Sequence, residues 1–193
     1  MALGDHPQDL MPNLFSSSEL DALGAKLGRA AYENAFEGDE PLAKRIFAGG
    51  AVDPDREIEF TTELLVWSFF TFHVMLRDTI PATERERVTA AMIGIGRLAD
   101  AAMRKHNGVQ EINETKWNQL ISDRFHEYDE LLPVVDSRGP VKLAGAVSRR
   151  LTGGSSPDPT VALPILVTLQ TTRKHVTPGI KTMWDTACAS RST

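Results

Sequence analysis

The chain has 193 residues, of which 41% are hydrophobic and 24% are charged, and its formal net charge at pH 7 is −5. This composition is typical of an ordinary soluble globular protein, and a chain of this length can bury about 70% of its unfolded surface. A fold that depends on internal disulfides is excluded, because Cys188 is the only cysteine. The single thiol also favours a reducing compartment, so we expect a cytoplasmic protein.

Helical patterns dominate the chain from its start. Ser18, followed by Asp21, is typical of a helix N-cap and predicts a helix that runs to about Phe36. A capping box of Thr83 with Glu86 predicts the start of another helix. Together with the proline and glycine breaks, these signals predict further helices over about 41–48, 56–79, 84–107, 114–132 and 140–151.

The predicted helix over 56–79 contains the most apolar stretch of the chain. This stretch is interrupted by Ser68, Thr71 and His73, and it is shorter than the roughly 20 residues that a membrane span requires. We therefore predict a core helix and no membrane association. The N-terminal residues show no basic start followed by an apolar run, so no secretory signal is expected.

The C-terminal part of the chain contains a clear break. The segment LTGGSSPDP predicts an exposed linker over 152–159, because glycine, serine and proline favour turns. Farther along, Thr177 and Pro178 have the pattern of a cap and a first-turn proline, so we predict two separate helical pieces. No sustained alternation of apolar and polar residues indicates strands, and no internal repeat is evident.

The expected fold is an all-α, single-domain bundle of six to eight helices. Its central helices are those over about 56–79, 84–107 and 114–132. Residues 1–16 are expected to form a flexible N-terminal segment, and residues 17–193 the helical domain.

Two pairs of glycines lie inside predicted helices. Gly24 and Gly28 are four residues apart, and Gly94 and Gly96 are two apart. The second pair lacks the preceding strand and the third glycine of a dinucleotide-binding motif. We interpret both pairs as positions where a neighbouring helix approaches closely.

Charge is unevenly distributed along the chain. Residues 1–136 carry 24 acidic and 13 basic side chains, whereas residues 137–193 carry 2 acidic and 8 basic ones. The basic segment also has a full set of apolar residues, so we expect it to dock on the acidic body. It contains no recognisable nucleic-acid-binding module, and nucleic acid is not an expected partner.

A candidate site begins with an arginine on an apolar helix face. Arg124 lies one turn from both Leu120 and Tyr128 in the stripe of its helix. A guanidinium group that points at a core costs several kcal/mol unless an acid or carbonyl groups meet its donors. We therefore predict that an acid of the most apolar helix meets Arg124. Candidate acids on this helix include Glu59 and Glu63, and Asp78 at its far end.

His73 lies in the same apolar helix, between Phe72 and Val74. We expect a neutral imidazole with one nitrogen hydrogen-bonded, and it could join the cluster around Arg124. The candidate ligand-binding residues are thus Glu63, His73, Arg124 and Tyr128. The interpretation that we favour is nevertheless structural: these residues form an internal ion pair that fixes the register of two helices.

Motifs for metal binding and catalysis are weak or absent in the sequence. Asp123 and His126 have the spacing of one half of a di-iron site, but no second acid-x-x-His follows. The sequence contains no GxSxG, GxxxxGK[ST] or HExxH motif. We therefore predict no metal, no cofactor and no catalytic residue, and we regard an enzyme as the less expected outcome.

Three functions remain open at this point. The leading hypothesis is a helical protein-interaction or regulatory module that acts through a protein partner or self-association. The second is a small-molecule or lipid pocket between the three central helices. The residues expected to line it are Phe69, Phe70, Phe72, Met75, Met92 and Tyr128. The third is an enzyme that uses Arg124, His73 and Glu63 on an acidic substrate.

Overall fold

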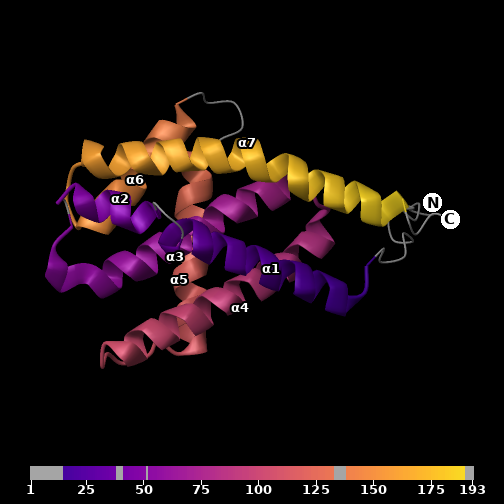
Figure 1. Cartoon of the computed structure of the whole chain (residues 1–193), viewed down its shortest axis with the longest axis horizontal. Coiled ribbons are helices and arrows are strands. Elements are labelled where there is room, and N and C mark those ends of the chain that lie inside the picture. The colour runs from indigo at the N-terminus through magenta and orange to yellow at the C-terminus, as the bar shows by residue number, and fades with distance from the viewer. Residues whose placement is uncertain (1–14, 38–40, 51, 133–137, 190–193) are drawn as a thin grey trace, which may run out of the picture.

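The computed structural model describes residues 15–37, 41–50, 52–132 and 138–189 (Figure 1). The predicted N-terminal segment lies almost entirely outside these ranges. Within them the chain forms seven α-helices, one short 3-10 helix and no strand. They are α1 (Ser17–Phe36), α2 (Leu42–Ala48), η1 (Pro54–Arg56), α3 (Glu57–Arg77), α4 (Ala82–His106), α5 (Glu114–Leu131), α6 (Gly139–Thr152) and α7 (Pro159–Ala189). The predicted all-α, single-domain bundle is confirmed.

The central element is α3, the helix that carries the most apolar stretch. Fifteen of its 21 residues are buried, and it contacts α1, α4, α5, α6 and α7. A helix that is apolar on nearly every side is stable in water only when other helices surround it. The composition of α3 therefore dictates its position in the bundle.

Two apolar clusters cover opposite sides of α3. On one side, Phe60, Leu64 and Trp67 pack with residues of α2, α6 and α7. On the other side, Leu65 and Phe69 pack with residues of α1, α4 and α5. The long helix α7 (yellow in Figure 1) runs the length of the molecule and contributes to both clusters.

The most extensive helix contact in the described ranges lies between α1 and α4. A Cβ atom added at Gly24 would fall 2.4 Å from the Val88 carbonyl oxygen, and one added at Gly28 would fall 2.9 Å from the Met92 carbonyl oxygen. The interpretation of this first glycine pair is therefore confirmed.

The second glycine pair behaves differently at its two positions. A Cβ atom at Gly96 would fall 2.0 Å from the Phe69 ring, so α3 does approach α4 closely there. The interpretation is wrong for Gly94, where an added Cβ atom would meet nothing within 4 Å. Two residues along a helix differ by about 200° in direction, so only one of them can face the neighbouring helix.

The helix starts agree with the predictions only in part. Asn113 caps α5 by accepting a hydrogen bond from the Lys116 amide at 2.8 Å. The predicted N-cap at Ser18 is wrong, because Ser16 forms the capping box of α1. The predicted capping box at Thr83 is also wrong. Because α4 already begins after Pro81, Thr83 lies inside its first turn.

The prediction of two helical pieces at the C-terminus is wrong, because α7 continues through Pro164 and Pro178. Proline removes a backbone donor and disfavours helix. Buried side chains on both sides of the prolines, at Val161, Ile165 and Ile180, hold the segment against the bundle nonetheless. Tertiary packing therefore outweighs the local preference.

The basic segment docks on the acidic part of the chain, as predicted. Arg150 of α6 pairs with Glu127 of α5, and Arg173 of α7 pairs with Asp78, each at 2.9 Å. In the part of the chain that is described, no helix is both long enough and apolar enough to cross a membrane.

Gly24→Ala should lower the free energy of unfolding by about 1–3 kcal/mol, because the added methyl group would force α1 away from α4. Gly94→Ala is the matched control within a helix. Its methyl group meets open space, so better helix propensity should raise stability by up to about 1 kcal/mol. Urea unfolding measures both variants, and equal effects would contradict the packing of α1 on α4.

Candidate functional site

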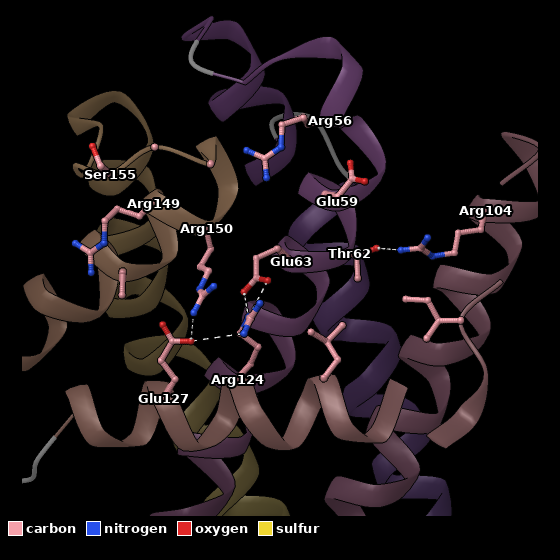
Figure 2. Close-up of a pocket in the computed structure, with 15 residues that line it drawn as sticks. Arg56, Glu59, Thr62, Glu63, Arg104, Arg124, Glu127, Arg149, Arg150 and Ser155 are labelled. Atoms are coloured by element: carbon pink, nitrogen blue, oxygen red, sulfur yellow. Dashed lines mark hydrogen bonds and ion pairs between the residues drawn. The ribbon is translucent and has the colours of Figure 1, made fainter. Parts of the chain in front are cut away.

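A cavity of about 570 Å³ lies where η1, α3, α4, α5 and α6 meet (Figure 2). Its wall is rich in charge, and arginine outnumbers glutamate. The charged lining residues are Arg56, Arg104, Arg124, Arg149, Arg150, Glu59, Glu63 and Glu127. Apolar wall comes from Ile112 and Leu120, and the loop that follows α6 contributes Gly153 to Ser155. The wall therefore carries a net positive charge around a space large enough for a small molecule.

The predicted partner of Arg124 is present. Its Nε donates to both carboxylate oxygens of Glu63 at 3.0 Å, and the hydroxyl of Tyr128 donates to the same carboxylate. The side chains of Arg124 and Glu63 are only 19% and 10% exposed. The prediction that an acid of α3 meets Arg124 is confirmed. A ligand-binding role for these three residues stays a prediction.

Burial and charge set the protonation states of this cluster. Burial raises the pKa of Tyr128 well above its usual value, and the carboxylate of Glu63 raises it further. The phenol is therefore a permanent hydrogen-bond donor near neutral pH. Burial alone would lower the pKa of Arg124, but the charge and hydrogen bonds of Glu63 outweigh it, so the pKa of Arg124 is raised overall.

A second carboxylate lies between two guanidinium groups. Oε2 of Glu127 is 2.9 Å from Nη2 of Arg150 and 3.6 Å from Nη1 of Arg124. Figure 2 shows these two contacts in a row with the pair of Arg124 and Glu63. Glu127 thus links α5 to α6 at the edge of the cavity.

A second buried ion pair, which the sequence does not predict, lies on α4 where it packs against α3. Nε of Arg104 donates to Asp100 at 2.7 Å, and Thr62 donates to the other carboxylate oxygen at 2.6 Å. Asp100 is only 3% exposed. The spacing of four residues between Asp100 and Arg104 is visible in the sequence. Only the packing of α4 on α3 shows that the pair is buried and reaches Thr62.

Two arginines of the wall have no polar partner in the part of the chain that the structure describes. Across the described ranges of the chain, the side chains of Arg56 and Arg149 make no hydrogen bond or ion pair. The guanidinium group of Arg56 lies against Gly153, where an added Cβ atom would fall 1.5 Å from its Nη1. Gly153 also has a φ of 69°, a backbone conformation that favours glycine. The two guanidinium groups are free to bind an anion.

His73 lies outside the cavity wall. Its Nδ1 is 3.2 Å from the hydroxyl oxygen of Thr89, and its ring packs against Phe125. The prediction that His73 could join the cluster of Glu63 and Arg124 is therefore wrong. Burial lowers the pKa of His73; Asp129 opposes this shift, while Arg85 and Arg77 add to it.

The six residues expected to line an apolar pocket have another position. Phe69, Phe70, Phe72, Met75, Met92 and Tyr128 are all buried in the core. None of them belongs to the wall of the charged cavity. Aromatic residues at helical spacing therefore form part of the hydrophobic core in this protein and do not line the charged cavity.

The weak metal signal gains no support from the geometry. Nε2 of His126 is 3.3 Å from Glu130, and both side chains are exposed. Within the described ranges, no group of three or more His, Cys, Asp or Glu side chains is arranged to hold a metal ion.

No known family model, characterised protein or solved structure matches the chain. The chemistry of the cavity wall therefore carries the functional argument. Guanidinium groups are planar donors with several N–H groups each, and they suit carboxylate and phosphate groups.

Arg124→Met should lower the free energy of unfolding by about 3–5 kcal/mol, because the charge of Glu63 would stay buried without a counterion. Adding Glu63→Gln removes that charge and keeps a partner for Tyr128. The double variant should therefore be at least about 1 kcal/mol more stable than Arg124→Met alone. Chemical denaturation measures both, and a double variant that is less stable than the single one would contradict the pairing.

His73 should make stability depend on pH. Because its pKa is lowered in the folded state, its contribution is present above the unfolded pKa of about 6.5 and is lost as pH falls below that value. The urea midpoint of the wild type should drop between about pH 7.5 and about pH 5.5, and His73→Gln should reduce this drop. An identical drop in both proteins would show that His73 titrates equally in the folded and unfolded states.

Proposed function

We propose that the protein binds a small anionic molecule in the arginine-lined cavity. The observation that carries this proposal is that two guanidinium groups in a concave wall, Arg56 and Arg149, have no polar partner among the described residues. An unpaired cation beside low-dielectric walls attracts an anion more strongly than the same cation on a flat surface. Carboxylate and phosphate groups are the chemistry that such a site fits.

The wall also suits a molecule with some apolar surface. Ile112 and Leu120 lie in the same cavity as the arginines, so the ligand can combine an anionic group with a carbon skeleton. This proposal develops the small-molecule alternative and replaces its apolar lining with a charged one. The helical interaction module, self-association, the enzyme and the cytoplasmic location stay predictions.

Isothermal titration calorimetry with inorganic pyrophosphate and with citrate tests the proposal. We expect saturable binding that weakens as salt is added, because solvent-exposed charges are screened. Arg56→Met and Arg149→Met should each raise the dissociation constant by about tenfold, the scale of one hydrogen bond to a charged group. Neither variant should change the thermal midpoint by more than about 2 °C, because neither side chain has a polar partner to lose among the described residues.

Arg97→Met is the matched control. Arg97 lines a different pocket between α4 and α5, so its loss should leave the dissociation constant unchanged. Absence of binding by the wild type, or equal weakening by all three variants, would overturn the proposed function.

A further inference from the structure

The cavity contains two kinds of carboxylate. Glu63 is 10% exposed and accepts hydrogen bonds from Arg124 and Tyr128. Glu127 is 32% exposed, and its partner Arg150 is 45% exposed. Exposed ion pairs contribute only about 0–1 kcal/mol, whereas breaking a buried pair costs several kcal/mol. Glu63 is therefore a fixed countercharge, and Glu127 is an exchangeable one.

The position of Glu127 has the geometry of an anion subsite. One oxygen, Oε2, contacts the guanidinium groups of both Arg150 and Arg124, which come from different helices. Nε of Arg124 is already bound to Glu63, so its Nη1 atom is the part that faces Glu127. A phosphate or carboxylate oxygen placed at this point would make the same contacts.

We propose that Glu127 is an internal competitor for the ligand, and that the ligand is a polyanion. One anionic group replaces the carboxylate of Glu127 between Arg124 and Arg150, and another binds the unpaired Arg56 and Arg149 of the same wall. The ligand class is a small molecule with two or more phosphate or carboxylate groups. This inference rests on the proposed function and adds the subsite, the class and the competitor.

Competition has a measurable consequence for affinity. The ligand must separate Glu127 from Arg150 before it can use Arg150, so Glu127 should weaken binding. Glu127→Gln removes the charge at nearly constant shape and should tighten pyrophosphate binding by about tenfold. Glu59→Gln is the matched control, because Glu59 lines the same cavity but has no partner among the described residues. Its loss changes only the general field and should tighten binding by less than about threefold.

Three further measurements by titration calorimetry complete the test. Arg150→Met should weaken pyrophosphate binding by about tenfold, because the displaced carboxylate leaves Arg150 to the ligand. Inorganic phosphate should bind at least about tenfold more weakly than pyrophosphate, since it cannot reach both groups of arginines. Citrate in parallel shows whether carboxylates serve as well as phosphates, and tight binding of either polyanion supports the proposal.

The results that would contradict the role of Glu127 as a competitor differ from those that would overturn the proposed function. If pyrophosphate binds through Arg56 and Arg149 but Glu127→Gln has no more effect than Glu59→Gln, the competitor role is wrong and the site remains. If Glu127→Gln weakens binding, Glu127 positions Arg150 for the ligand and does not compete with it. If no polyanion binds the wild type or Glu127→Gln, the proposed function itself fails. Equal affinity for phosphate and pyrophosphate overturns the polyanion class.

Discussion

The neutralisation of Arg124 by Glu63 is the interaction on which the rest of the site depends. Both side chains are largely buried, and an unmatched charge there costs several kcal/mol. Tyr128 adds a third member, and burial keeps its hydroxyl protonated as a donor by raising its pKa. Because Arg124 and Tyr128 both belong to α5 and Glu63 belongs to α3, this cluster fixes how the two helices cross. The direction in which Glu127 points follows from that crossing.

The site therefore combines arginines that buried ion pairs hold in place with arginines that have no polar partner among the described residues. Two arginines of the wall are held by buried ion pairs, Arg124 by Glu63 and Arg104 by Asp100. The free-energy cost of burying these charges is met when the protein folds, before a ligand binds. Arg56 and Arg149 stand at the same cavity without partners in the described ranges. A ligand would therefore meet some arginines that are already held in position and others that need not break an ion pair before they bind it. Both features lower the cost of binding.

Part of this arrangement could be predicted from the sequence and part could not. A guanidinium group on the apolar stripe of a helix has to find an acid, so the pairing of Arg124 with α3 follows from local pattern and energy. The cavity does not follow, because Arg149 and Arg150 become wall residues only when α6 docks beside α5. His73 shows the same limit, since its apolar neighbours predict burial but not that Thr89 is its partner. The sequence also does not show which side of α4 faces α3. An added Cβ atom would meet Phe69 of α3 at Gly96 but would meet nothing within 4 Å at Gly94.

The most direct test of the central claim is the exchange of the Arg124 Nε–H proton with water, followed by nitrogen-15 NMR. A side-chain N–H held against a buried carboxylate exchanges slowly, whereas an exposed guanidinium exchanges fast. We expect a protected resonance that disappears in Arg124→Lys and loses its protection in Glu63→Gln. A wild-type Arg124 Nε–H that exchanges as fast as that of the exposed Arg29 would contradict it.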